Sequence, residues 1–133
     1  MKFNLTSILT NGKPGELVNI NIKEISRKLN IEFNPNKIFY ITDLNSKESR
    51  GNHSNYNASE ILICLNGSFE IKLNDGKNET IYTINKNEGI YIPKNIWLSF
   101  YDFKNCVILV FVEIDVEIKK NSEYNFNKFK NKR

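Results

Sequence analysis

The sequence predicts an all-β protein built from short antiparallel strands that close into a sandwich or barrel. Apolar and polar side chains alternate strictly in residues 68–74, as in a half-buried strand. The pair Asp75-Gly76 follows at once, and it is typical of a tight hairpin turn. Similar apolar runs recur along the chain, separated by Asn, Gly, Asp and Pro. Helical periodicity is weak by comparison.

Individual elements follow from the same patterns. One short helix is expected over residues 22–30, where Ile22, Ile25 and Leu29 have helical spacing. Asn66-Gly67 is expected to form a tight turn between two strands. The predicted strands cover residues 3–9, 16–20, 37–43, 60–66, 68–74, 79–84, 90–92, 97–102 and 106–114.

Length and charge favour one domain with a basic end. A chain of 133 residues is a common size for a single domain, here taken as 1–133. The net charge of +4 comes largely from a tail beginning near residue 117. Such a tail is either a nucleic-acid arm or a solvated terminus, and we favour the latter because no nucleic-acid-binding motif accompanies it. We expect an amphipathic or loosely packed segment there, with Tyr124, Phe126 and Phe129 as possible anchors.

The cysteines and the apolar runs indicate a cytoplasmic protein. Cys64 and Cys106 each lie inside an apolar run, which is typical of free thiols packed in a core. No apolar stretch approaches the length of a membrane-spanning helix, and the first residues lack the apolar core of a signal peptide. We therefore expect no membrane association.

The most informative stretch runs from Arg50 to Gly67. It contains Arg50-Gly51, then His53 and Asn55 two residues apart, then Glu60. This spacing resembles the first cupin motif, in which His-x-His and a later Glu lie on neighbouring strands that face a barrel interior. Residues 89–93, Gly-Ile-Tyr-Ile-Pro, resemble part of the second cupin motif. The resemblance implies an all-β, cupin-type (jelly-roll) antiparallel barrel with at most a short helical segment.

A catalytic metal is not expected. Transition metals need three or four nitrogen, oxygen or sulfur ligands at one point. Here His53 and Glu60 match the cupin ligand positions, whereas Asn55 stands at the second histidine and Leu98 at the last. We accordingly predict no metal and no cofactor.

A narrower resemblance covers residues 37–112. The Arg-Gly-x-His core, the run Ile-Leu-Ile-Cys-Leu-Asn-Gly-Ser and the later run Gly-Ile-Tyr-Ile-Pro-Lys-Asn-Ile-Trp are similar to the dTDP-4-keto-6-deoxyglucose 3,4-ketoisomerases. These are metal-free cupins of deoxyamino-sugar biosynthesis. The resemblance implies a sugar 3,4-ketoisomerase that binds a dTDP-linked keto-deoxysugar. It also implies a homodimer that exchanges N-terminal strands, with apolar side chains at Phe3, Leu5, Ile8 and Leu9.

The implied reaction moves a ketone from C4 to C3 and needs a base with a pKa near neutrality. His53 is the only histidine, so it is the candidate base. Tyr40 matches a family position for a pocket tyrosine that donates protons, or it is simply a core tyrosine. Arg50 suits the pyrophosphate because its guanidinium presents a fork of donors, although a surface ion pair is the alternative.

Further candidates concern substrate binding. Tyr91, Trp97 or Tyr101 could stack on thymine, with core packing the competing role. Glu60 either orients His53 or is an ordinary strand-edge charge, and Lys94 either reaches a phosphate or is a solvated loop residue. Asn55 can hydrogen-bond a sugar oxygen but cannot take up a proton near pH 7.

Three positions depart from the family pattern. Asn55 replaces a second histidine, Leu98 replaces a basic residue after the tryptophan, and Pro14-Gly15 stands where Arg-Gly is common. These changes leave two other functions open. One is a non-catalytic cupin that binds a nucleotide sugar, and the other is a related nucleotide-sugar epimerase. The sequence does not decide between galacto and gluco products.

Overall fold

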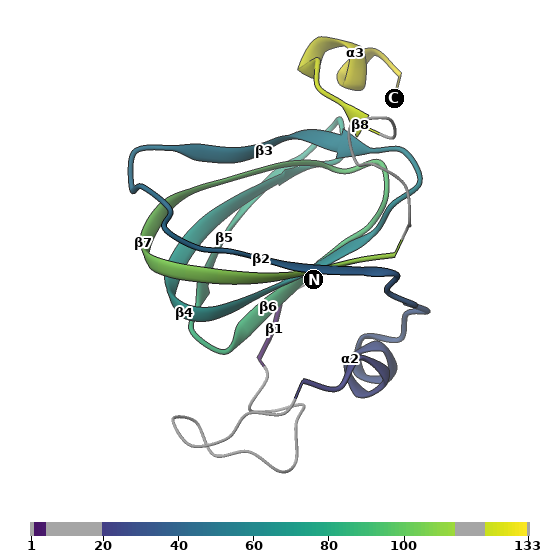
Figure 1. Cartoon of the computed structure of the whole chain (residues 1–133). Coiled ribbons are helices and arrows are strands. Elements are labelled where there is room, and N and C mark those ends of the chain that lie inside the picture. The colour runs from purple at the N-terminus through teal and green to yellow at the C-terminus, as the bar shows by residue number, and fades with distance from the viewer. Residues whose placement is uncertain (1, 5–19, 114–121, 133) are drawn as a thin grey trace.

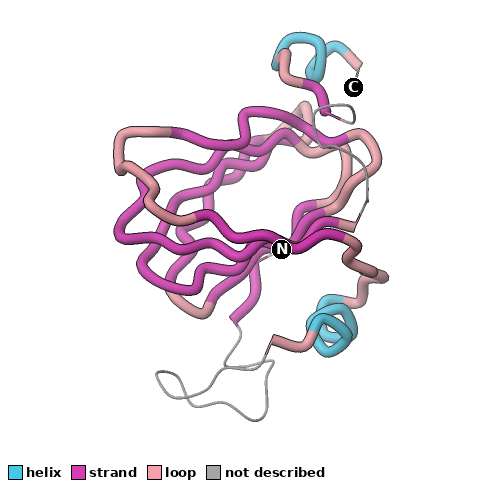
Figure 2. The backbone as a smooth tube through the Cα atoms, in the orientation of Figure 1, coloured by secondary structure: helices cyan, strands magenta, loops and turns pink. Residues whose placement is uncertain are grey.

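The computed structural model describes residues 2–4, 20–113 and 122–132. In this part of the chain, antiparallel strands curve around an apolar interior, with one short helix on each of two sides (Figures 1 and 2). The strands are β1 (Lys2–Asn4), β2 (Lys37–Ile41), β3 (Ser49–Asn55), β4 (Glu60–Asn74), β5 (Glu79–Asn85), β6 (Glu88–Ile92), β7 (Trp97–Val112) and β8 (Ser122–Glu123), and the helices are α2 (Ile22–Leu29) and α3 (Phe126–Asn131).

Two long strands organise the barrel. β4 and β7 pair with each other from Glu60 opposite Val112 to Asn74 opposite Trp97. One half of this pair is flanked by β6 and β2, and the other half by β5 and β3. The two halves curve toward each other, which gives the predicted cupin-type architecture. The predicted single helical segment, residues 22–30, is confirmed as α2, and α3 is a second short helix.

The Asn66-Gly67 turn was a wrong prediction. β4 runs through this point as one strand, with register shifts between Cys64 and Ser68 that mark β-bulges. Gly67 has φ +68°, and a Cβ there would lie 1.9 Å from the Lys104 carbonyl oxygen of β7. Glycine therefore lets the two bent strands β4 and β7 approach closely. The pair Asn-Gly occurs at such a bend as well as in a tight turn, which is why a turn was predicted. The two predicted strands 97–102 and 106–114 are likewise one strand, β7, which contains Asp102 and Asn105 at positive φ.

Other predicted elements have mixed outcomes. The hairpin between β4 and β5 is confirmed, and the Asn74 side chain accepts a hydrogen bond from the Gly76 amide at 2.7 Å. Of the predicted strand 3–9, residues 3 and 4 lie in β1, and the rest lies outside the described residues. Residues 16–19 of another predicted strand also lie outside them, and Ile20 is not in a strand. Strand β3, which carries the central motif, was missing from the strand pattern.

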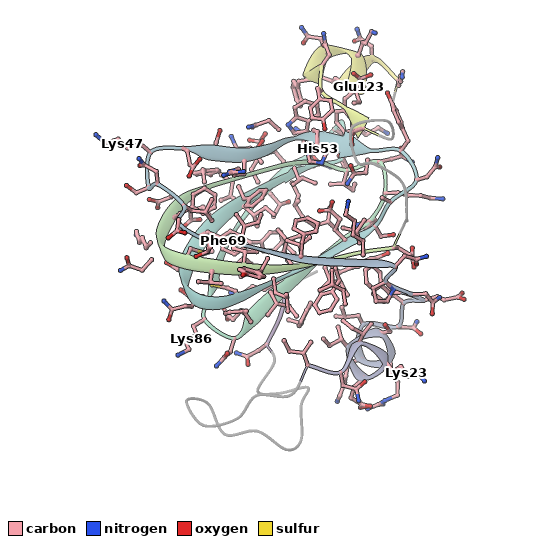
Figure 3. The ribbon with its side chains drawn as sticks, in the orientation of Figure 1. Lys23, Lys47, His53, Phe69, Lys86 and Glu123 are labelled. Carbon is pink, nitrogen blue, oxygen red and sulfur yellow. The ribbon has the colours of Figure 1, made fainter. Side chains whose placement is uncertain are left out.

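The apolar side chains form two clusters, one inside the barrel and one outside it. The inner cluster includes Phe69, which lies within the barrel in Figure 3, and both Cys64 and Cys106. Both cysteines are buried free thiols, as predicted. The outer cluster joins Ile25 of α2 to Ile61 and Ile63 of β4. Helix α2 therefore covers the outer face of the same strand that lines the interior.

The end of the described chain packs against β3. We call residues 122–132, which contain β8 and α3, the C-terminal strap. Ser122 and Glu123 pair with Asn55 and Ser54 of β3. The rings of Phe126 and Phe129 lie 5.1 and 5.6 Å from the Trp97 ring, which confirms both as anchors. Among the described residues, no helix is long and apolar enough to cross a membrane.

Candidate active site

Strand β3 brings the motif residues to a cavity inside the barrel. A register shift between Gly51 and His53, with Gly51 at φ +80° and Asn52 at φ +54°, lets neighbouring side chains of one strand reach the same space. The cavity has a volume of about 160 Å³. Its polar side chains are those of Arg50, His53 and Glu60. The other lining residues are Phe39, Ile41, Gly51, Leu62, Leu98, Phe100 and Val110.

His53 lies in this cavity as a poorly hydrated imidazole. Among the described residues, neither of its buried ring nitrogens has a hydrogen-bond partner. Burial lowers the pKa of His53 below its usual 6.5. The Gly51 backbone and the Asn55 side chain lie close enough to oppose this shift, but neither reaches hydrogen-bond geometry with the ring. The ring is neutral near pH 7, which is the state that a base requires.

Glu60 is a buried carboxyl that lines the same cavity. It is 5% exposed, and burial raises its pKa to about 7. Its Oε1 accepts a hydrogen bond from Asn55 Nδ2 at 3.0 Å. Asn55 Oδ1 in turn accepts a hydrogen bond from the Ser122 hydroxyl of the strap at 2.7 Å. Glu60 is therefore more than a strand-edge charge, and Asn55 rather than His53 is its hydrogen-bond partner.

Arg50 lies at the solvent side of the cavity. Its side chain is 50% exposed and forms an ion pair with Glu48 at 3.5 Å. An exposed ion pair of this kind contributes little to stability, so the guanidinium can exchange Glu48 for another anion at small cost. Arg50 therefore forms the surface ion pair that was the alternative prediction, and it also places a cation beside the cavity.

The structure does not bring the remaining predicted residues to this cavity. Tyr40 is 67% exposed, because it alternates along β2 with Phe39 and Ile41, which line the cavity. Tyr91 packs edge-on against Phe33 outside the barrel. The other three also lie away from the cavity lining: Trp97 lies under the strap, Tyr101 follows the inward-facing Phe100, and Lys94 is exposed in the β6–β7 loop.

The strap reaches the motif histidine, a contact that the sequence pattern did not indicate. The Tyr124 ring lies against the His53 ring, with centroids 5.4 Å apart. Tyr124 was expected to be an anchor, and only the three-dimensional fold shows that it packs on the motif histidine. Leu98 is 1% exposed and lines the cavity, so its departure from the family pattern changes the cavity itself.

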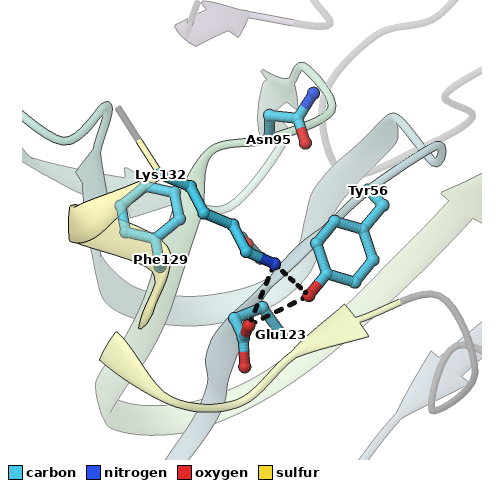
Figure 4. Close-up of a pocket in the computed structure, with 6 residues that line it drawn as sticks. Tyr56, Asn95, Glu123, Phe129 and Lys132 are labelled. Carbon is cyan, nitrogen blue, oxygen red and sulfur yellow. Dashed lines mark hydrogen bonds and ion pairs between the residues drawn. The ribbon is translucent and has the colours of Figure 1, made fainter. Parts of the chain in front are cut away.

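A second cavity of about 240 Å³ lies between the strap and β3 (Figure 4). Its polar groups interact with one another. The Tyr56 hydroxyl and Glu123 Oε1 are 3.0 Å apart, and Lys132 Nζ lies 3.3 Å from the first and 3.6 Å from the second. Because these polar groups bind one another and attach the strap to the barrel, we place the candidate active site in the His53 cavity instead. Among the described residues, no group of three His, Cys, Asp or Glu side chains could hold a metal ion.

Comparisons with known proteins find sugar 3,4-ketoisomerases that are similar to this chain. The chain is 33% identical over 88 residues to a TDP-4-oxo-6-deoxy-α-D-glucose 3,4-oxoisomerase of Aneurinibacillus thermoaerophilus, a match that spans 65% of this chain and 63% of that protein. It is 32% identical to the structure of WlaRA, a TDP-fucose 3,4-ketoisomerase of Campylobacter jejuni, with TM-score 0.80 over 98% of this chain and 92% of that one.

Two further structures concern a ligand and the fold. A variant of the 3,4-ketoisomerase QdtA of Thermoanaerobacterium thermosaccharolyticum, in which a histidine is replaced by asparagine, was solved with TDP-4-keto-6-deoxyglucose. It is 27% identical, with TM-score 0.81 over 99% of this chain and 91% of that one. An RmlC epimerase of Mycobacterium tuberculosis has TM-score 0.73 over 92% of this chain and 66% of its own, but only 10% identity, and it shows the fold alone.

The chain also matches the model of a protein family along almost its whole length. The model of the family described as "FdtA: WxcM-like, C-terminal" covers residues 4–133, which includes the barrel, the motif strand β3 and the strap. The chain belongs to this FdtA/WxcM-like family.

Proposed function

We propose that this protein is a sugar 3,4-ketoisomerase that converts TDP-4-keto-6-deoxyglucose to a TDP-3-keto-6-deoxyhexose. The observation that carries the proposal is the neutral His53, whose two ring nitrogens are buried, in a cavity that is also lined by the cation Arg50. The 3,4-ketoisomerases to which the chain is similar along nearly its whole length support it.

Each polar residue of the cavity has a part in this reaction. His53 takes the proton from C3 and returns a proton to C4 of the enediolate, which is possible for one base because the two carbons are adjacent. Arg50 exchanges its contact with Glu48 for the pyrophosphate. A volume of about 160 Å³ is small for a whole ligand site, so the cavity takes the sugar and leaves the nucleotide outside. Tyr40, Tyr91, Lys94, Trp97 and Tyr101 do not line the cavity, so we assign them no part in holding the sugar.

The test is incubation of the protein with TDP-4-keto-6-deoxyglucose in heavy water, followed by NMR. We expect a 3-keto product with deuterium at C4, and its coupling constants distinguish the galacto from the gluco product. His53→Asn should lower the rate roughly 10²- to 10⁴-fold. Tight binding of TDP without exchange or product would instead favour the non-catalytic binder, and inversion at C3 or C5 with the ketone still at C4 would favour the epimerase.

Arg50 provides a second test with a matched control. Arg50→Ala should raise KM for the substrate and weaken TDP binding, because the pyrophosphate loses its cation. Arg27→Ala removes an even more exposed guanidinium from α2, where it is paired with Glu24, and should leave both KM and TDP binding unchanged. Equal effects of the two substitutions would contradict a specific role for Arg50.

A homodimer and a cytoplasmic location complete the proposal. β2 pairs only with β7 among the described strands, and it carries the exposed apolar side chains Ile38 and Tyr40, at 60% and 67% exposure. A second subunit would cover them. Sedimentation velocity should give twice the chain mass for the wild type and less dimer for Ile38→Lys. The two free thiols suit the reducing cytoplasm.

A further inference from the structure

The proposed reaction moves two protons, and His53 accounts for only one of them. As the C3–H bond breaks, its electrons form the C3=C4 bond and the C4 carbonyl electrons move onto oxygen. The C4 oxygen must then gain a proton and the C3 hydroxyl must lose one, so that the C3 carbonyl can form while C4 is protonated. A second group is needed to carry the proton from one oxygen to the other.

The cavity holds one side chain suited to that transfer. Of the residues that line it, Arg50, His53 and Glu60 carry polar side chains, and a guanidinium offers only hydrogen-bond donors. Asn55, which stands where relatives have a second histidine, cannot take up a proton near pH 7. In this chain its amide instead donates to Glu60 Oε1 at 3.0 Å. Asn55, which replaces a titratable histidine, therefore holds the titratable carboxyl of Glu60 in place.

We propose that Glu60 is the second proton-transfer residue of this site, where its carboxylic acid gives a proton to the C4 oxygen and receives the proton of the C3 hydroxyl. This inference rests on the proposed isomerase function. The carboxyl is an acid again when both transfers are complete, so no other reactant is required. Its two oxygens can serve two adjacent substrate oxygens, whereas the carbon-to-carbon transfer stays with His53.

The surroundings of Glu60 favour the acid form that this role needs. It is 5% exposed, and among the described residues the titratable or charged side chains that share its cavity are His53 and Arg50 of β3. β2, β4 and β7 present apolar residues there, including Phe39, Leu62 and Val110. Its strand neighbour on β6 is Ile92, which is also apolar. Burial raises the pKa of Glu60 to about 7, and the bond from Asn55 only partly opposes this.

The pH dependence follows from the two residues. His53 must be neutral, so the rate rises as the pH increases through its lowered pKa. Glu60 must be protonated, so the rate falls as the pH increases beyond about 7. The product of the two gives a bell-shaped profile of kcat/KM for the wild type.

The experiment compares Glu60→Gln with Glu70→Gln. The amide oxygen of the introduced glutamine can still accept from Asn55, so the cavity stays intact while the acid is lost. We expect kcat to fall roughly 10²- to 10⁴-fold, KM and TDP affinity to change little, and the descending limb of the pH profile to disappear. Glu70 lies on the same strand but bonds Thr83 on β5, and its substitution should leave rate and profile unchanged.

The outcomes separate the two levels of the proposal. A wild-type protein that fails to form the 3-keto product overturns the isomerase function itself. An active wild type with a fully active Glu60→Gln variant, or with the descending limb retained in that variant, overturns the role of Glu60 alone. A melting temperature near that of the wild type shows that a lower rate does not come from unfolding.

Discussion

The Tyr124 ring lies against the imidazole of His53, 5.4 Å between centroids, although the two residues are far apart in the sequence. Since neither His53 nitrogen is hydrogen-bonded among the described residues, packing holds this imidazole in place. The strap therefore contacts the proposed base directly, through the Tyr124 ring.

Removing the Tyr124 ring should raise the pKa of His53. Burial lowers this pKa, so the hydration that follows Tyr124→Leu should move it back toward 6.5. Tyr124→Phe keeps the ring and should leave the pKa low. His53 is the only histidine, so its ring proton signals in an NMR titration are unambiguous. An unchanged pKa in the Leu variant would show that the strap does not shield the imidazole.

Stability should fall as the pH rises from about 4.5 to about 7. Glu60 has a pKa of 4.5 when unfolded and about 7 when folded, so the folded state holds a proton that the unfolded state has lost in this range. The buried carboxyl is uncharged in both states below the range and ionised in both above it. Across this pH range the free energy of unfolding should therefore decrease by about 3 kcal/mol.

Urea unfolding at several pH values measures this loss, and Glu60→Gln should remove it. Glu70→Gln should retain it. Identical pH dependence of stability in the wild type and the Glu60→Gln variant would mean that Glu60 ionises normally in the folded protein.

Substitution of Gly67 should be far more damaging than substitution of Gly76. Both have positive φ, +68° and +99°, so alanine carries a similar backbone cost of roughly 1–2 kcal/mol at each. At Gly67 the new Cβ would also meet the Lys104 carbonyl oxygen at 1.9 Å. We expect Gly76→Ala to fold with a modestly lower melting temperature and Gly67→Ala to lose several kcal/mol or to aggregate. Similar melting temperatures would contradict the close approach of β4 and β7.

Phe129→Ala should loosen the strap without unfolding the barrel. Phe129 of the strap is 3% exposed and contacts Trp97, and the loss of a buried phenylalanine costs roughly 3–5 kcal/mol. Hydrogen exchange should accelerate in residues 122–132 and at Ser54 and Asn55, and stay slow in β4. Phe126→Ala removes a ring from a residue that is 36% exposed and should have a smaller effect. Uniform acceleration across the barrel would mean that strap and barrel unfold together.

Much of the fold could be predicted from local patterns, and the failures have identifiable causes. Alternation in residues 68–74 and the Asp75-Gly76 turn led to the correct hairpin, because both depend on neighbours in the sequence. Strand β3 contains Gly51, Asn52 and His53 and lacks an alternation of apolar and polar residues. A β-bulge between Gly51 and His53 sets the direction of its side chains. The Arg-Gly-x-His motif marked this segment as functional, whereas hydrophobic periodicity did not predict it as a strand.

Only the site residues that belong to the sequence motif could be predicted. His53, Arg50 and Glu60 were identified because their motif resembles those of the cupins and the 3,4-ketoisomerases, and the structure brings them to one cavity. Tyr40 faces the other side of its strand because side chains alternate, so a one-residue difference decides which of Phe39 and Tyr40 lines the cavity. Tyr124 and Ser122 reach the site only through tertiary pairing, for which the sequence contains no local signal.

The pairing of the strap with β3 also bears on how the protein responds to heat. Its hydrogen bonds join residues 67 positions apart, as between Asn55 and Ser122, and it rests on a small number of aromatic contacts outside the barrel. Peripheral units of this kind open locally before the whole molecule unfolds. On warming, we therefore expect activity to disappear several degrees below the calorimetric transition and to return on cooling, as long as the barrel itself has stayed folded.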